Sequence, residues 1–284
     1  MSNLEISRAE RLDHYVTTKL PEFSRAHVSK LIDSGIVQVN GEVVTKSGYK
    51  IRPTDEIIID FEMSAQPPLP EIELQVIYED DDCIVINKPS GVLSHSKGAY
   101  NPEATVASWL QSRLRGIEGE RAGIVHRLDR ATSGVMICAK NEAASSWLQK
   151  QFSQRKVKKV YQAVVKGSLD PLQALIEMPI ERNPKKPQTF RVGSNGKTAQ
   201  TEYLVIKSDG NYSTLELKPT TGRTHQLRVH LEHLGHPIVG DSLYGGEPAD
   251  RLYLHAKSLE ITLPSRQRKV FESKVPDEFS KLYE

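Results

Sequence analysis

The chain has 284 residues, of which 38% are hydrophobic and 26% charged, and its mean hydropathy is −0.45. This composition is typical of a folded, water-soluble protein and excludes a wholly disordered chain. The sequence contains no run of 18 apolar residues and no secretory signal at its start, so we expect a cytoplasmic protein without a membrane span. The only two cysteines, Cys83 and Cys138, lie in short apolar runs and are predicted to be buried free thiols.

The net charge of +2 is unevenly distributed along the chain. Residues 150–200 contain 11 basic and 3 acidic residues, a net charge of +8, so the remainder of the chain carries a net charge of −6. A basic stretch in an otherwise weakly acidic protein favours binding to a polyanion, because lysine and arginine displace counterions from phosphates. On charge alone, a solvated basic surface explains the stretch equally well.

The start of the chain predicts a small module of two helices, a hairpin and a strand. An amphipathic helix is expected over residues 8–20, and a second helix begins after the N-cap residue Ser24 and ends at Gly35. Asn40-Gly41, between two β-rich runs, is the strongest short signal for a β-hairpin. A further strand is expected at residues 57–59.

A proline-rich linker separates this module from the rest of the chain, and we expect domains at residues 1–62 and 72–284 joined by residues 63–71. The second domain combines three helical patterns, at 104–114, 141–155 and 224–234, with seven β-rich runs. These runs lie at residues 74–78, 83–87, 135–139, 160–166, 199–206, 213–217 and 258–263. Because strands outnumber helices and several follow one another directly, the sequence predicts an α+β fold with a mainly antiparallel mixed sheet.

The densest polar stretch runs from Gly123 to Gly134 and leads into an apolar strand. It places Asp129 between Arg127 and Arg130, so we expect this carboxylate to be negatively charged at pH 7. A positioned carboxylate can act as a nucleophile or as a general base. A structural salt bridge is an equally good interpretation of the spacing alone.

A second polar stretch lies at residues 221–231 and is expected to begin a helix capped by Thr224. Arg223 and Arg228 lie near the start of this helix, where they can bind phosphate or orient a carboxylate. Surface ion pairing is the alternative. The histidines that follow, beginning with His230, match no metal-binding spacing, so no metal site is predicted.

A basic segment enters the strand predicted at 160–166. Lys158 and Lys159 could hold phosphates there while Tyr161 stacks on a nucleobase. The alternative is an ordinary, half-buried strand tyrosine. No glycine-rich phosphate-binding loop is present, so the sequence implies no nucleotide cofactor.

The stretch from His126 to Gly134 resembles the signature of the RluA-type pseudouridine synthases. Four further segments resemble the same family in the same order, at residues 87–91, 159–163, 222–228 and 235–241, so the resemblance covers nearly all of the second domain. The first sixty residues resemble the S4 (S-four) type of RNA-binding domain, which several members carry in front of the synthase.

The resemblance implies that a uridine in RNA is detached from its sugar, turned and rejoined through C5, without a metal, redox or nucleotide cofactor. It implies Asp129 as the nucleophile, attacking either the sugar or the uracil ring. Arg228 would pair with Asp129. Tyr161 would stack on the uracil and assist the final deprotonation. Arg127 would fill the gap left by the flipped uridine, since a planar guanidinium can replace lost stacking.

RNA is therefore the expected partner of a monomeric enzyme, with large-subunit ribosomal RNA as the first expectation and transfer RNA as the alternative. Besides Arg127, the residues expected to bind RNA are Arg25, Lys30, Lys46, Lys50, Lys158, Lys159 and Arg223. Two functions from other classes remain open at this point. One is a non-catalytic RNA-binding or ribosome-assembly factor, and the other is a metal-assisted hydrolase built on the histidines.

Overall fold

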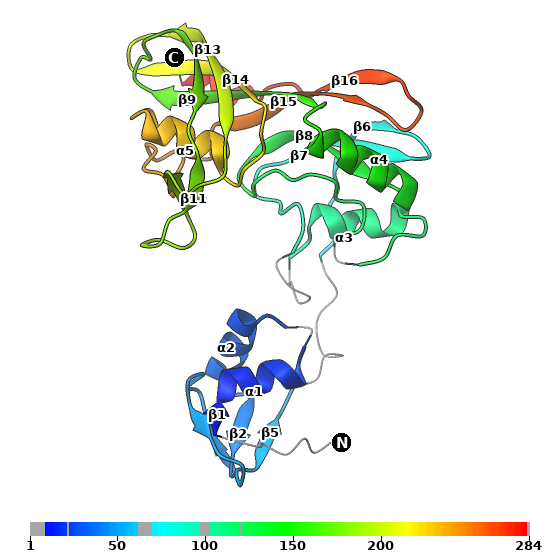
Figure 1. Cartoon of the computed structure of the whole chain (residues 1–284), viewed down its shortest axis with the longest axis vertical. Coiled ribbons are helices and arrows are strands. Elements are labelled where there is room, and N and C mark those ends of the chain that lie inside the picture. Colours follow the sequence, from blue (N-terminus) through cyan, green and yellow to red (C-terminus); the bar gives the residue numbers. More distant parts are fainter. Residues whose placement is uncertain (1–8, 22, 62–69, 97–102, 120, 283–284) are drawn as a thin grey trace. The chain divides into compact units, whose positions relative to one another are not determined.

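The structure is a computed structural model that describes residues 9–21, 23–61, 70–96, 103–119 and 121–282 (Figure 1). The chain divides into two compact units, Met1–Glu71 with Ser96–Ala104, and Ile72–His95 with Thr105–Glu284. Most of the predicted linker, and Arg8, lie outside the described residues. The helix predicted over 8–20 begins later than expected, at Leu12, because Glu10–Arg11 form a strand. In the part of the chain that is described, no helix is long and apolar enough to cross a membrane.

The first unit contains two helices, α1 (Leu12–Lys19) and α2 (Arg25–Asp33), and two small sheets. Its strands are β1 (Glu10–Arg11), β2 (Val37–Val39), β3 (Glu42–Val43), β4 (Lys50–Ile51) and β5 (Ile57–Ile59). Strand β1 pairs with β4, and β2 lies between β3 and β5. Apolar residues of both helices and of β2 and β4 form the core of this unit.

The local signals of the first unit are confirmed. The hydroxyl of Ser24 accepts a hydrogen bond from the backbone N–H of His27 and so caps α2. Gly35, beyond the end of the same helix, has a φ of 86°. Asn40 and Gly41 both have positive φ, at 52° and 82°, as the tight turn between β2 and β3 requires.

The second unit is built on a mixed sheet that confirms the predicted fold class. Among the described residues this sheet has nine strands, in the order β10-β13-β14-β9-β15-β8-β7-β6, with β16 paired to β15. All neighbours are antiparallel except β15 and β8. The strands are β6 (Gln75–Glu79), β7 (Cys83–Lys88), β8 (Ser133–Ala139), β9 (Lys158–Lys166), β10 (Gln173–Glu177), β13 (Gln200–Ser208), β14 (Tyr212–Pro219), β15 (Leu254–Thr262) and β16 (Arg268–Glu272).

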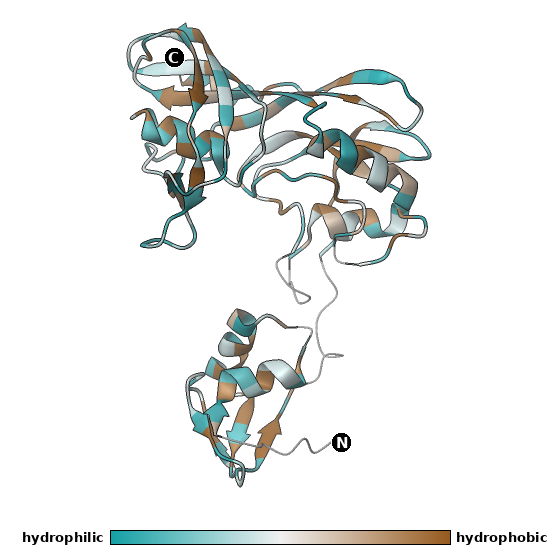
Figure 2. Ribbon diagram, viewed as in Figure 1, coloured by the Kyte–Doolittle hydropathy of each residue, from teal (hydrophilic) through white to brown (hydrophobic). Residues whose placement is uncertain are grey.

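Both faces of the sheet are covered at β8, where every residue is buried. Alternate residues of a strand point to opposite faces. Val135 and Ile137 therefore pack with helix α4 (Glu142–Ser153), while Met136 and Cys138 pack with helix α3 (Val106–Leu110). Figure 2 shows hydrophobic and hydrophilic residues alternating along strands and helices. The two cysteines are buried and free, as predicted.

Two more helices, α5 (Gln226–His233) and α6 (Glu278–Lys281), and a hairpin of β11 (Ile180–Arg182) and β12 (Phe190–Val192) complete the unit. The helix predicted over 104–114 is shorter than expected, because α3 continues as a 3-10 turn at Gln111–Arg113. The hairpin and the strands β10 and β16 were not predicted.

Gly134 allows the paired strands β8 and β15 to approach each other closely. Its φ is 115°, and a Cβ atom at this position would overlap the backbone of Ala256. We expect Gly134→Ala to reduce the free energy of unfolding by at least about 2 kcal/mol. Urea titration followed by tryptophan fluorescence measures this effect in the correct unit, since the two tryptophans, Trp109 and Trp147, both belong to it.

The matched control is Gly210→Ala. Gly210 also has a positive φ, of 95°, but nothing lies within 4 Å of an added Cβ. Gly210→Ala is expected to reduce the free energy of unfolding by about 1 kcal/mol, through backbone conformation alone. Equal losses in the two variants would show that the contact with β15 is unimportant.

Candidate active site

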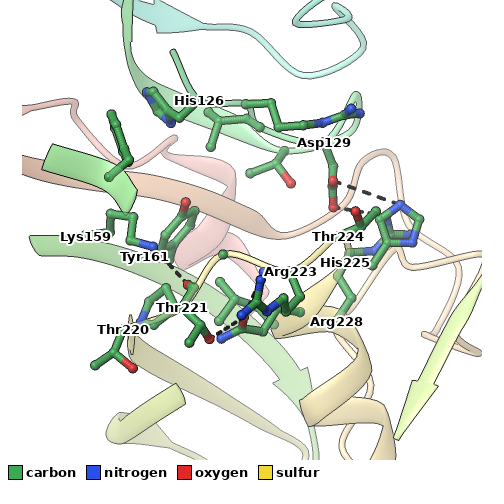
Figure 3. A pocket seen from close by; sticks show the side chains of 18 of the residues that line it. His126, Asp129, Lys159, Tyr161, Thr220, Thr221, Arg223, Thr224, His225 and Arg228 are labelled. Carbon is green, nitrogen blue, oxygen red and sulfur yellow. Dashed lines mark hydrogen bonds and ion pairs between the residues drawn. The ribbon is translucent and has the colours of Figure 1, made fainter. Parts of the chain in front are cut away.

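A pocket of about 480 Å³ lies in the second unit, where Leu254 of β15 and four segments that are distant in sequence meet (Figure 3). They are the loop 125–132 before β8, the end of α4 at 152–155, the start of β9 at 159–161, and residues 219–228, which lead into α5. A volume of this size takes a single small-molecule ligand or one component of a larger one. The polar stretches found in the sequence thus come together in one place.

Asp129 is the only acid among the described residues that line this pocket. Its Oδ2 atom lies 3.5 Å from Nη1 of Arg228, and its Oδ1 atom lies 4.0 Å from Nε2 of His225. Both partners come from the start of α5, so each carboxylate oxygen faces a different nitrogen from the same turn of chain. Figure 3 shows this arrangement, with Tyr161 and Lys159 side by side on β9.

The two arginines that flank Asp129 in sequence make contacts elsewhere. Nη1 of Arg127 lies 3.3 Å from Nε2 of His95, and Nε of Arg130 donates to the carbonyl of Gly91 at 3.0 Å. The cation that pairs with Asp129 is therefore Arg228, which is distant in sequence and is brought to the carboxylate by the fold.

Hydrogen bonds to the segment after β7 fix the loop on both sides of Asp129. The hydroxyl of Ser94 donates to the carbonyl of Leu128 at 2.8 Å and accepts from its N–H at 3.2 Å. The hydroxyl of Ser90 donates to the carbonyl of Ala131 at 2.7 Å. These bonds orient the carboxylate by holding its backbone.

Lys88, at the end of β7, is fully buried beneath the same loop. Its Nζ donates to the carbonyls of Pro89 and Val92, each at 2.8 Å, and of Arg130 at 3.3 Å. Burial lowers the pKa of Lys88 to about 7, while the charge of Asp129 opposes this shift. Three carbonyl acceptors match the three N–H bonds of an ammonium group. Lys88 thus joins β7 to the loop that carries Asp129.

Arg228 forms a buried ion pair with Asp241 in addition to its contact with Asp129. Its Nε and Nη2 atoms donate to the two carboxylate oxygens of Asp241, both at 2.7 Å. Burial would lower the pKa of Arg228, but the hydrogen bonds and charge of Asp241 and the charge of Asp129 raise it. The sequence predicted only the pairing with Asp129, which the structure shows as the longer of the two contacts.

Tyr161 extends from β9 into the pocket and is partly buried. Its ring packs against the apolar clusters on both sides, one containing Leu227 and the other Leu128. Burial, and the charge of Asp129, raise the pKa of Tyr161 far above its usual value, so the phenol stays protonated at neutral pH. The ring presents a flat surface close to the carboxylate.

The two lysines predicted to act together on β9 are separated by the alternation of the strand. Nζ of Lys159 lies at the pocket and donates to the carbonyl of Thr221 at 3.0 Å. Nζ of Lys158 pairs with Glu260 at 3.2 Å, and its side chain is exposed. Burial lowers the pKa of Lys159 to about 8. Lys159 is therefore the one of the two that lines the pocket.

Other basic residues of the pocket are Arg127, Arg155 and Arg223. Nε of Arg223 donates to the carbonyl of Thr198 at 3.0 Å, which fixes the guanidinium at the pocket. Several cations of the basic stretch 150–200 are paired with acids, namely Lys158 with Glu260, Lys166 with Glu247 and Arg191 with Glu181. Of the basic residues of this stretch, Arg155 and Lys159 line the pocket.

The four basic residues predicted to bind RNA from the N-terminal module belong to the first unit. Lys30, Lys46 and Lys50 are exposed there. Arg25 instead donates two hydrogen bonds, each of 3.1 Å, to the buried carboxylate of Asp13. All four side chains are exposed, and Arg25 also stabilises its own unit through Asp13.

The prediction that Thr224 caps α5 is wrong. The N-cap residue is His225, with a φ of 56° and no side-chain capping bond. The side-chain Oε1 of Gln226 accepts from the backbone N–H of Arg223 at 3.0 Å and from the hydroxyl of Thr221 at 2.7 Å. These bonds form a tight turn before the helix and shift the cap position by one residue.

Sequence reasoning assigned no role to His225, Asp241, Tyr244 or Lys88. Lys88 and Asp241 lie in segments that matched the family, but nothing in their spacing shows what they contact. Both ring nitrogens of His230, a candidate in the metal hypothesis, are hydrogen-bonded to protein, Nδ1 to Thr201 at 3.0 Å and Nε2 to a backbone carbonyl at 3.0 Å.

Two family models match the chain. Residues 82–233 match the model described as RNA pseudouridylate synthase, and residues 10–57 match the S4 domain. An "Uncharacterized RNA pseudouridine synthase" of Aquifex aeolicus is 39% identical over 295 residues, covering 96% of this chain and 93% of the relative. The "Ribosomal large subunit pseudouridine synthase D" of Borreliella burgdorferi is 39% identical over 287 residues, covering 95% of this chain and 88% of the relative.

The fold is also similar to that of a solved structure. "Human RNA Pseudouridylate Synthase Domain Containing 1" superposes with a TM-score of 0.60 and is 32% identical, covering 73% of this chain and 84% of that chain. At this identity the likeness extends beyond the general arrangement of strands.

Proposed function

The chain belongs to the RNA pseudouridylate synthases, which isomerise uridine in RNA, and on this premise we propose that its substrate is large-subunit ribosomal RNA and that Asp129 is its nucleophile. The substrate is supported by the names of relatives from Borreliella burgdorferi and Haemophilus influenzae, both called ribosomal large subunit pseudouridine synthase D.

The observation that carries the proposal is the setting of the Asp129 carboxylate. It is the acid of a pocket that also holds a tyrosine ring, and its two oxygens face Arg228 and His225. A nearby guanidinium favours the ionised carboxylate, which is the form that can attack. A protein that only binds RNA has no use for such a group.

The reaction rearranges bonds without net oxidation. The bond between C1′ of the ribose and N1 of uracil breaks, and a bond between C1′ and C5 forms. The C5 proton is lost to water, and N1 gains a proton. Asp129 would attack either C1′ or the ring, forming an ester or ring adduct that releases the carboxylate when the new bond is complete. Because electrons balance, this chemistry needs no redox cofactor.

The uridine must leave its helix or loop to enter the pocket. Flipping a base costs a few kcal/mol, which favourable contacts must offset. The Tyr161 ring offers a stacking surface for the uracil. Because its phenol stays protonated, Tyr161 would assist the final deprotonation only as a relay, taking up the C5 proton while passing its own proton to water. Arg127, which is exposed at the pocket, would fill the gap in the RNA.

The RNA backbone around the flipped uridine would be held by Lys159 and Arg223 at the pocket. Contacts further along the RNA would come from the S4 domain, through the exposed Lys30, Lys46 and Lys50. Such contacts add affinity through counterion release and do not depend on base sequence.

Transcripts that carry tritium at uridine C5 test the proposal directly, because forming the C1′–C5 bond releases that tritium to water. Large-subunit ribosomal RNA and bulk transfer RNA would be compared at equal uridine concentration. Faster release from ribosomal RNA is expected. Faster release from transfer RNA would show that transfer RNA is the substrate. Tight binding without release from either RNA would indicate an assembly factor.

The charge state of Lys159 gives a pH dependence. Because its pKa is about 8, the amine is charged below this pH and neutral above it. RNA binding is therefore expected to weaken by up to about tenfold between pH 7 and pH 9 at fixed ionic strength. The control is Lys159→Arg, whose guanidinium stays charged throughout. If both proteins lose affinity equally, as measured by fluorescence anisotropy, Lys159 does not bind the RNA.

A further inference from the structure

His225 is the other residue that faces the carboxylate of Asp129, and the proposed reaction assigns it no role. Its backbone adopts the left-handed region, with a φ of 56°, which residues other than glycine rarely do. Its side chain is 16% exposed, and Nε2 lies 4.0 Å from Oδ1 of Asp129. Sparsely populated backbone conformations of this kind cluster at functional sites.

The other ring nitrogen of His225 is held by Tyr244. Nδ1 lies 2.8 Å from the hydroxyl oxygen of Tyr244, and the same oxygen accepts the backbone N–H of Phe190 at 2.9 Å. Among the described residues, Nδ1 is the only hydrogen-bond acceptor in contact with the phenol oxygen, so the phenol proton is satisfied when it is donated to Nδ1. The imidazole then carries its own hydrogen on Nε2, which faces Asp129.

Packing fixes the plane of the imidazole as well as its tautomer. The ring of Tyr244 meets it edge to face, with centroids 5.6 Å apart and an interplanar angle of 89°. The ring of Phe190 meets it at 5.7 Å and 77°. Burial lowers the pKa of His225 below its usual value, and the charge of Asp129 opposes this only in part, so the ring is a neutral N–H donor.

We propose that His225, held by Tyr244 as the tautomer with its hydrogen on Nε2, is a positioning residue that orients Oδ1 of Asp129 for attack. The two neighbours of Asp129 face different carboxylate oxygens, since Arg228 faces Oδ2 and His225 faces Oδ1. A contact of 4.0 Å shortens to a hydrogen bond when substrate closes the site, as catalytic hydrogen bonds commonly do. This inference rests on the proposed role of Asp129 as nucleophile.

Two amide substitutions separate the proposed role from a structural one. In His225→Gln the amide nitrogen can occupy the place of Nε2 and donate to Asp129, but the contact with Tyr244 is lost. In His225→Asn the shorter amide can reach Tyr244 but not Asp129. Asparagine also tolerates a positive φ far better than glutamine does. A purely structural role therefore predicts that His225→Asn is the milder change.

The positioning role predicts the opposite order in tritium release. His225→Asn should lower kcat by about 10- to 100-fold with KM within about twofold of wild type. His225→Gln should stay within about fivefold of the wild-type kcat, because it keeps a donor beside Asp129. Tyr244→Phe keeps the ring but frees the tautomer, and its kcat should fall between these two variants with KM unchanged.

Equal or higher activity of His225→Asn relative to His225→Gln would overturn the inference, as would losses confined to KM. Wild type and Asp129→Asn are measured alongside. If wild type releases tritium only when Asp129 is intact, the proposed function stands whatever the His225 variants do. No release from wild type on any RNA would overturn the proposed function, and this inference with it.

Discussion

Asp129→Asn is expected to reduce tritium release from uridine-labelled RNA by at least about 10⁴-fold, the size of loss typical when a nucleophile is removed. An amide cannot form the bond that the carboxylate forms, yet it has nearly the same shape. Its carbonyl oxygen can take the place of Oδ2, which lies 3.5 Å from Nη1 of Arg228, so the pocket should keep its geometry. RNA affinity is therefore expected to change by no more than about twofold.

The matched control is Glu232→Gln, which makes the same change of charge on the exposed face of α5. It should leave both tritium release and affinity unchanged. If Asp129→Asn binds RNA much more weakly while its unfolding curve matches that of wild type, Asp129 is a binding residue. Substantial residual turnover would place the nucleophile elsewhere.

Signals that act between near neighbours in sequence could be recognised without the fold. The turn at Asn40-Gly41 depends on two residues that accept positive φ, and the cap at Ser24 depends on a hydroxyl three residues before an amide. The same kind of local signal predicted the wrong N-cap residue at Thr224. There the side chain of Gln226 forms the turn, and a cap rule that considers only the residue type of the cap position cannot anticipate this.

The missed strands β10 and β16 show a second reason for failure. Burial alternates along both strands, but Leu175 and Val270 are apolar residues at outward positions, 55% and 57% exposed, so neither sequence alternates polar with apolar residues. Each is defined by its partner, β13 or β15, through hydrogen bonds that any sequence can make. Strand propensity of this kind depends on tertiary context.

The sequence predicted where the site lies, but not all of the contacts between its side chains. The polar stretch around Asp129 indicated a functional loop, and its neighbours Arg127 and Arg130 were the obvious sources of positive charge. The resemblance to the family implied Arg228 as the partner of Asp129, and the structure shows this pair; no sequence argument predicted His225, which the fold brings to the other carboxylate oxygen. The separation of Lys158 from Lys159, by contrast, follows from strand alternation and was within reach of the sequence.

Arg228→Leu should both destabilise the second unit and inactivate the enzyme. The substitution leaves the carboxylate of Asp241, whose side chain is fully buried, without its guanidinium partner. Breaking one side of a buried ion pair costs about 3–5 kcal/mol. Unfolding followed by tryptophan fluorescence measures the loss in this unit. Inactivity alone would be ambiguous, because an unfolded enzyme is also inactive.

Adding Asp241→Asn to Arg228→Leu resolves the ambiguity. The amide removes the unpaired charge, and its oxygen can still accept the backbone N–H bonds of Leu243 and Tyr244, which are 3.2 and 3.3 Å long. The double variant should therefore regain at least about half of the lost stability, because the two sites are in direct contact and their effects do not add. Its kcat should nevertheless stay at least about 100-fold below wild type, because Asp129 still lacks the guanidinium at Oδ2.

The single variant Asp241→Asn completes the double-mutant cycle formed with Arg228→Leu and the double variant. Arg228 then keeps Asp129 as its charged partner, so this variant should retain more activity than the double variant even where the two are equally stable. If activity instead follows stability across all three variants, Arg228 acts only by holding the fold together. If activity follows the presence of the guanidinium, Arg228 acts on the nucleophile directly, and the stability that its buried pair with Asp241 confers is a separate contribution.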